Sequence, residues 1–207
     1  MLHIKTKHIS KHTTLFGAFV FICLYIIATL YYPGGSQVDV NEKGFSWLNN
    51  YWCNLLNDKA INGQTNAAKP IAMVAMLVLC FTLANFWYIF PQHLQFKKSG
   101  RLAIQISGMI AMSIAMFLFT SLHDWIINIA SLFAFVAIIG MFVGLYKQKW
   151  LWLFKLGAFN ILLVVLNNIL YYSNGLKLYL PVVQKITFLF FLIWICLIDI
   201  RMHNTPS

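Results

Sequence analysis

Charge is scarce in this chain: only 10% of its 207 residues are Asp, Glu, Lys or Arg, and only five residues are acidic. An ordinary soluble domain carries about 25% charged residues. Here 60% of the residues are hydrophobic, more than a soluble core of this length can bury. The composition therefore excludes an ordinary soluble protein and predicts a single membrane domain that covers residues 1–207.

The sequence also lacks the short motifs of metal, nucleotide and hydrolase sites. Its four cysteines form no CxxC or CxxxC pair, which argues against a closed zinc site. A Walker loop, a GxSxG elbow, an HExxH motif and a Gly-rich dinucleotide fingerprint are all absent. We therefore expect neither a metal ion nor an organic cofactor.

Six apolar runs dominate what is present. They cover residues 15–32, 70–90, 102–122, 125–146, 151–172 and 180–200. Each is close to the ~20 residues with which a helix crosses about 30 Å of hydrocarbon. Only a helix can span alone with every backbone group satisfied. We therefore expect an all-α integral membrane protein, a bundle of six transmembrane helices with one long outer loop at residues 33–69.

The net charge of +10 comes mainly from short segments between these runs. The basic residues outside the long loop and the outer ends of the helices are Lys5, Lys7, Lys11, Lys97, Lys98, Arg101, Lys147, Lys149, Lys155 and Arg201. In a six-span chain they share one face, which the positive-inside rule assigns to the cytoplasm. We therefore expect cytoplasmic termini, a bacterial inner membrane and no nucleic-acid partner. Run 15–32 could instead be a cleaved signal peptide, but Leu30-Tyr31-Tyr32 is a poor cleavage site, which disfavours this alternative.

The long loop is unusually aromatic. Residues 44–64 contain two Trp, one Tyr, one Phe and five Asn. Apolar residues recur there at three- and four-residue steps, at Phe45, Leu48, Trp52, Leu55 and Leu56. This spacing predicts a short amphipathic helix at the outer membrane surface. The helix is either an anchor packed on the bundle or a lid over a site walled by Asn50, Asn54 and Asp58.

Polar side chains at membrane depth are the best site candidates, because a polar group in hydrocarbon needs a partner. They gather in the outer half of the bundle. The candidate ligand-binding residues are Asn54, His123, Asn128, Asn167, Asn168 and Lys185. Structural roles are the alternative: asparagines can join helices, Lys185 can reach the lipid headgroups, and Asp124 can cap a helix.

A catalytic interpretation uses the same residues. Histidine is the side chain best suited to proton transfer near neutral pH, so His123 is the candidate acid and base, with Asp124 or Asp58 to orient it. Lys185 and the asparagine amides suit a phosphate or carboxylate headgroup. The other histidines fall on the cytoplasmic side, so they cannot complete a metal site with His123.

Four functions follow from these observations. The leading one is binding of membrane lipid or a small amphiphile in an outer-leaflet polar pocket, without demonstrable catalysis. The others are an intramembrane enzyme acting on lipid headgroups with His123 as acid and base, a transporter or channel, and a scaffold for partner membrane proteins. Gly140 and Gly144 form a GxxxG step that predicts close helix packing, within the bundle or at a homodimer face.

The layout resembles the Frag/DRAM/Sfk superfamily of six-span membrane proteins and its bacterial relatives. The segments that carry the resemblance are Asn50-Tyr51-Trp52-Cys53-Asn54-Leu55, the Asn62-Gly63 turn with Asn66, and Ser121-Leu122-His123-Asp124. The superfamily often has Ser-Asp-Leu where this chain has Cys53-Asn54-Leu55. Eukaryotic members act in lipid remodelling, membrane lipid organisation and autophagy, so the resemblance implies a lipid-related role.

Overall fold

The computed structural model describes residues 12–120, 122–173 and 175–204, except the side chain of Asp124. Six long helices are α1 (Thr13–Leu30), α2 (Lys69–Ile89), α3 (Lys98–Ala115), α4 (His123–Lys147), α5 (Leu151–Tyr172) and α6 (Leu180–Asn204). Three short 3₁₀ helices are η1 (Trp52–Leu56), η2 (Phe90–His93) and η3 (Lys177–Tyr179). Over the described ranges the only β-type pairing is two isolated bridges in the long loop. The all-helical class is therefore confirmed.

Five helical segments are long and apolar enough to cross a membrane. They are Thr13–Leu30, Lys69–His93, Trp125–Lys147, Leu151–Tyr172 and Lys177–Asn204. These segments make the chain a multi-pass membrane protein by length and composition. The α3 helix is outside this set, because it carries polar residues such as Arg101 and Gln105 and ends at Ala115. The predicted helix 102–122 is thus too long at its C-terminal end, where residues 116–120 form turns.

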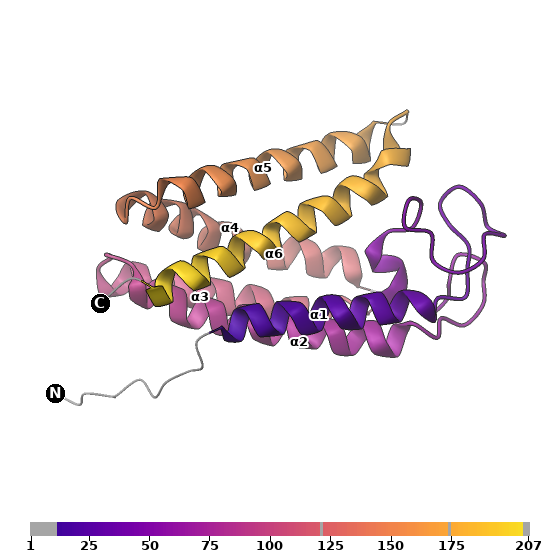
Figure 1. Cartoon of the computed structure of the whole chain (residues 1–207), viewed down its shortest axis with the longest axis horizontal. Helices are drawn as coiled ribbons and strands as arrows, with labels where there is room; N and C mark the ends of the chain where they lie inside the picture. The colour runs from indigo at the N-terminus through magenta and orange to yellow at the C-terminus, as the bar shows by residue number, and fades with distance from the viewer. Residues whose placement is uncertain (1–11, 121, 174, 205–207) are drawn as a thin grey trace.

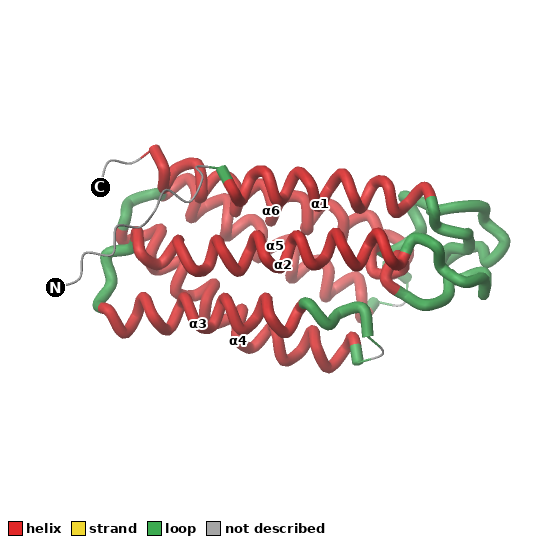
Figure 2. Tube along the Cα trace, turned by 90° about the horizontal axis from the view of Figure 1, so that it is seen from below, coloured by secondary structure: helices red, strands yellow, loops and turns green. Residues whose placement is uncertain are grey.

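The helices lie side by side in one bundle, and the long loop gathers at one end (Figures 1 and 2). The first turn of α1 and the last turn of α6 lie together at the opposite end, as Figure 1 shows. Neighbours in sequence pack most closely: α1 on α2, α2 on α3, α3 on α4 and α5 on α6. The α4–α5 contact is much sparser, which leaves space between α4, α5 and α6.

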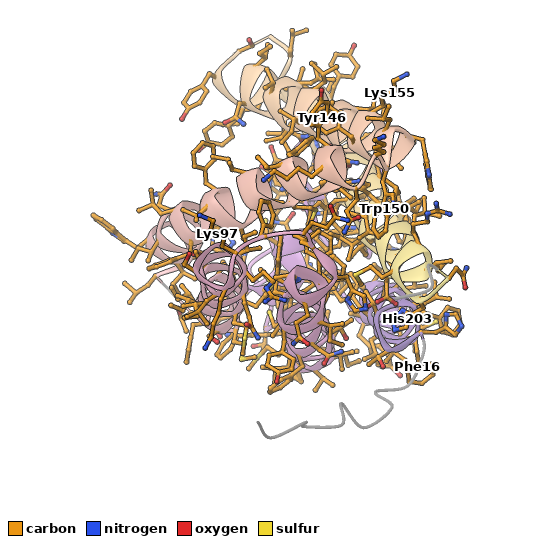
Figure 3. The ribbon with its side chains drawn as sticks, turned by 90° about the vertical axis from the view of Figure 1, so that its left-hand side faces the viewer. Phe16, Lys97, Tyr146, Trp150, Lys155 and His203 are labelled. Carbon is orange, nitrogen blue, oxygen red and sulfur yellow. The ribbon has the colours of Figure 1, made fainter. Side chains whose placement is uncertain are left out.

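Basic side chains ring the end of the bundle that is opposite to the long loop. Figure 3 looks onto this end, where Lys97 and Lys155 lie at the rim. Lys147 sits 4.7 Å above the Phe96 ring, and the Arg201 guanidinium lies 5.9 Å from the Trp150 ring. The described basic residues that were expected to share a face therefore do so.

Glycines allow close approach inside the bundle. A Cβ atom on Gly140 would come 2.3 Å from the Ile104 side chain, and one on Gly144 would come 2.7 Å from Leu94. Both glycines of the GxxxG step thus face neighbouring elements of the same chain. Their positions fit internal packing, which was the first of the two expectations.

Candidate functional site

Buried asparagines fix the shape of the long loop. The Asn50 carboxamide accepts a hydrogen bond from the Ser46 N–H at 2.8 Å and donates one to the Gly35 carbonyl at 2.9 Å. The Asn66 amide donates to the Asn54 carbonyl at 3.0 Å and to the Asn57 carbonyl at 2.9 Å. These side chains therefore satisfy backbone groups that no helix or sheet pairs.

Two expected site residues have structural roles in this loop. The Asn54 side chain is buried and accepts a 2.7 Å hydrogen bond from the Tyr51 N–H. Asp58 is exposed and pairs with the Lys69 ammonium at 2.5 Å. Neither residue lines the cavities described below. Ligand binding by Asn54 and orientation of His123 by Asp58 therefore stay predictions, and the structure places both residues outside these cavities.

The loop rests on the bundle through η1. The Trp52 ring packs 5.1 Å from Tyr25 on α1 and 5.2 Å from Phe188 on α6, measured between ring centres. Leu55 is also buried, but Leu48 is 67% exposed. The expected amphipathic helix is therefore only the five-residue η1, because residues 47–49 form a turn that directs Leu48 away from the core.

Lys185 ties the loop to α6. Its ammonium donates to the Asn50 carbonyl at 2.5 Å and to the Pro181 carbonyl at 2.8 Å. The same nitrogen lies 5.8 Å from the centre of the Phe45 ring. Two of the three donors of this ammonium are thus used within the protein, so Lys185 holds the loop in place and is less available to an anionic headgroup than expected.

A cavity of about 700 Å³ opens between the loop and the ends of α4, α5 and α6 nearest to the loop, and we call it the outer cavity after the side on which the sequence placed it. Its lining is mixed polar and aromatic. It includes Gln37, Tyr51, Cys53, Asn57, His123, Asn128, Asn168, Tyr172 and Lys177. Three of the expected site residues, His123, Asn128 and Asn168, therefore share one space.

A second cavity of about 510 Å³ lies deeper between α4, α5 and α6, and we call it the lateral cavity. Its apolar walls are Val164, Phe188 and Phe191, and its polar walls are Asn160, Asn167 and Thr187. The outer and lateral cavities share Ile127, Asn168, Tyr171, Leu180 and Gln184 as lining residues. The two spaces are therefore neighbours, polar toward the loop and mainly apolar toward the middle of the bundle.

A smaller cavity of about 240 Å³ lies under η1, and we call it the loop cavity. Its polar lining is Cys53, His123, Gln184 and Lys185, and aromatic residues of α1, η1 and α6 surround them. His123 is half-buried and lines both this cavity and the outer one. The side chain of Asp124 is outside the described part of the structure, so its expected role stays a prediction.

The asparagines of α5 bond first to their own helix. The amides of Asn160, Asn167 and Asn168 each donate to the carbonyl four residues earlier, at 3.0, 2.8 and 2.9 Å. The Asn167 amide also donates to the Thr187 hydroxyl at 2.6 Å, which joins α5 to α6. Asn167 thus makes the expected interhelical contact and also lines the lateral cavity, while its binding of a ligand stays a prediction.

Two lining residues, Tyr171 and Lys177, were not predicted from the sequence. Tyr171 lies four residues after Asn167, so helical spacing places it on the same face. Gln184, which the sequence already grouped with Lys185 in the outer half of the bundle, lines all three cavities. Lys177 lies in η3, outside the apolar runs, and lines the outer cavity. The helical period was the signal for Tyr171, whereas nothing in the local sequence pointed to Lys177.

Comparisons of the chain with protein-family models, with curated proteins and with solved structures find no match. The resemblance to the Frag/DRAM/Sfk superfamily stays a prediction.

Proposed function

We propose that this membrane protein binds a lipid or small amphiphile in the adjoining outer and lateral cavities. The observation that carries the proposal is the polarity change between the two spaces. His123, Asn128 and Lys177 offer hydrogen bonds and charge for a headgroup in the outer cavity. Val164, Phe188 and Phe191 offer apolar contact for a chain in the lateral cavity. For an amphiphile that enters from water, each buried methylene would contribute about 0.8 kcal/mol.

The proposed membrane placement has six spans, with α3 as the sixth. At 1.5 Å per residue, the 18 residues of α3 cover about 27 Å, close to the thickness of the hydrocarbon core. The helix packs against both α2 and α4. Six spans also agree with the start of α1 and the end of α6 lying at one end of the bundle.

Orientation follows from the basic end of the bundle. Lys97, Lys147 and Arg201 mark it as the cytoplasmic end by the positive-inside rule. The long loop and the outer cavity then face the opposite side of a bacterial inner membrane. A reporter fused to each terminus tests this placement, and reporters that respond on different sides of the membrane would contradict it.

Two neighbouring valines of α5 provide a matched test of binding. Val164 and Val165 are 47% and 48% exposed, but only Val164 lines the lateral cavity. We expect Val164→Trp to fill the cavity and weaken binding of a palmitoyl lysophospholipid by about tenfold or more, equal to ~1.4 kcal/mol. Val165→Trp should bind like the wild type. Equal affinities for the two variants would refute the proposed site.

A second candidate function is an enzyme that acts on lipid headgroups. It is favoured by the position of His123, which lines both the outer cavity and the loop cavity that contains Cys53. An imidazole placed there can accept and return a proton during headgroup transfer. Purified protein and a His123→Ala variant should then differ in lipid turnover. If lipid turnover is absent from both proteins, or equal in both, the enzymatic function with His123 as acid and base is refuted.

A further inference from the structure

Cys53 is the thiol of the candidate site. Of the four cysteines, all of which the structure describes, only Cys53 lines the outer and loop cavities. The others, Cys23, Cys80 and Cys196, lie in the long apolar helices α1, α2 and α6. Cys53 is half-buried and in the reduced, thiol form. It therefore faces the space in which the proposed function places a ligand.

The fold holds the Cys53 thiol in place from both sides. The preceding Trp52 ring packs between Tyr25 of α1 and Phe188 of α6, at 5.1 and 5.2 Å between ring centres. The following residue, Asn54, is buried, and its side-chain oxygen accepts a backbone N–H at 2.7 Å. Because both neighbours are anchored, the thiol has a fixed position where the outer and loop cavities adjoin.

A cation lies beside this thiol. Lys185 lines the loop cavity together with Cys53, and the two side chains interact electrostatically. The Lys185 ammonium also donates to the carbonyl of Asn50, which precedes Cys53 in the same loop. A neighbouring positive charge favours the thiolate over the thiol, and the thiolate is the nucleophilic form of cysteine. The surroundings of Cys53 therefore favour its reactive form.

An imidazole lines the same two cavities as the thiol. His123 begins α4, is half-buried, and lines both the outer cavity and the loop cavity, as Cys53 does. Ile127 and Gln184 line these two cavities and the lateral cavity as well. The thiol and the imidazole therefore adjoin the place where the head of a bound amphiphile meets its chain. In common membrane lipids that junction is a carboxylic ester, whose carbonyl carbon is an electrophile for a thiolate.

We propose that Cys53 accepts the acyl group of an ester amphiphile bound in the outer and lateral cavities. The sulfur attacks the ester carbonyl carbon, and His123 takes the thiol proton. The bond between that carbon and the alcohol oxygen then breaks, and His123 gives the proton to the departing alkoxide, so that a thioester and an alcohol form. Water later cleaves the thioester, which releases a fatty acid and restores the thiol. This inference rests on the proposed binding function and adds the reacting bond of the ligand.

Two lipids that differ at the reacting bond test the inference. One is palmitoyl lysophosphatidylglycerol, and the other is its hexadecyl ether analogue, which has no carbonyl carbon. We expect the protein in nanodiscs to bind both lipids. Only the ester should give a hydroxylamine-sensitive palmitoyl adduct on Cys53, or released palmitate, in mass spectrometry. If both lipids bind but the ester gives neither product, acyl transfer is overturned and the binding function stands. If neither lipid binds, both fall.

Two cysteine variants assign the reaction to its nucleophile. Cys53→Ala should abolish the adduct and the release of palmitate, whereas Cys23→Ala is the control and should keep them. Binding of the ether lipid by Cys53→Ala at wild-type affinity shows that the loss is chemical and not a failure to fold. Palmitate release that persists in Cys53→Ala would overturn the inference.

The pH profile of alkylation tests the role of Lys185. Iodoacetamide reacts with the thiolate, so the pH of half-maximal rate at Cys53 reports the ionisation of this thiol. Lys185→Met should move this midpoint to a pH about one unit higher, because the cation is lost. Lys185→Arg keeps the charge and should stay near the wild type. The maximal rate at high pH is a separate quantity, which reports access to the loop. A wild-type midpoint in Lys185→Met would overturn the activation of Cys53 by Lys185.

Discussion

The Lys185 ammonium donates a 2.5 Å hydrogen bond to the backbone carbonyl of Asn50, which joins α6 to a loop 135 residues away in sequence. The bond brings together the two parts of the molecule that enclose the loop cavity and the outer cavity. Because Asn50 itself orders the chain from Gly35 to Ser46, the contact connects α6 to the whole first half of the loop.

Replacing Lys185 by Met should loosen the loop. The variant keeps the length of the side chain but leaves the Asn50 carbonyl without its charged donor, a loss of about 1–3 kcal/mol. We expect a lower melting temperature and faster modification of Cys53 by a water-soluble maleimide. Lys155→Met is the control, because Lys155 is exposed on α5 at the far end of the bundle. Identical labelling rates in the two variants would show that Lys185 does not hold the loop against α6.

Replacing Asn66 by Asp should destabilise the loop from its other side. Aspartate keeps the oxygen that accepts the Ala68 N–H but loses the amide that donates to the Asn54, Leu55 and Asn57 carbonyls. We expect faster proteolysis of residues 31–68 and a lower melting temperature. Asn62→Asp is the matched control, because the Asn62 oxygen accepts the Gln64 N–H and is retained in the variant. Equal protease sensitivity of the two variants would show that the Asn66 amide is not needed.

The α5–α6 contact can be measured by a double-mutant cycle. Asn167→Leu, Thr187→Val and the double variant each remove the 2.6 Å hydrogen bond between the two helices. We expect a coupling free energy of about 0.6–2 kcal/mol in unfolding experiments in mixed micelles. Additive effects of the two single changes would mean that the hydrogen bond contributes nothing to stability.

Helix packing gives a prediction that is independent of the site. A Cβ atom on Gly108 would lie 2.3 Å from the Trp87 ring, so Gly108→Ala should cost about 1–3 kcal/mol by forcing α2 and α3 apart. On the same helix, a Cβ atom on Gly100 would meet only ordinary contacts, the nearest at 3.7 Å. Gly100→Ala should therefore be neutral or slightly stabilising. The melting temperatures of the two variants test this prediction. A Gly108→Ala protein that melts at the wild-type temperature would contradict the close packing of α2 on α3.

Hydrophobic runs predicted the helices well because burial in a membrane needs long apolar stretches. The predicted run 151–172 coincides with α5, and the other runs overlap their helices. The C-terminal end of α3 was predicted wrongly because residues 116–120 are mostly apolar. Their hydropathy is the same whether they form turns or continue a helix. Hydropathy indicates which residues avoid water, but it does not indicate whether their backbone is helical.

The site was predictable only in part. His123, Asn128 and Asn168 do line one cavity, as their shared position in the outer half of the bundle predicted. The roles of Asn54 and Lys185 were not predictable, because their partners are backbone groups whose positions depend on the folded loop. Side-chain type shows what a group can bond to, whereas the tertiary fold decides which partner it reaches.

One amphiphile is proposed to occupy the outer and lateral cavities together. Photo-crosslinking with a lysophospholipid that carries a diazirine in its chain, followed by mass spectrometry of the adducts, locates the bound chain. We expect adducts concentrated on the cavity walls, at Ile127, Val164 and Phe188, and competed by unlabelled lysophospholipid. Adducts spread over the exposed apolar surface at Leu132, Phe135 and Leu162, with none on those walls, would contradict it.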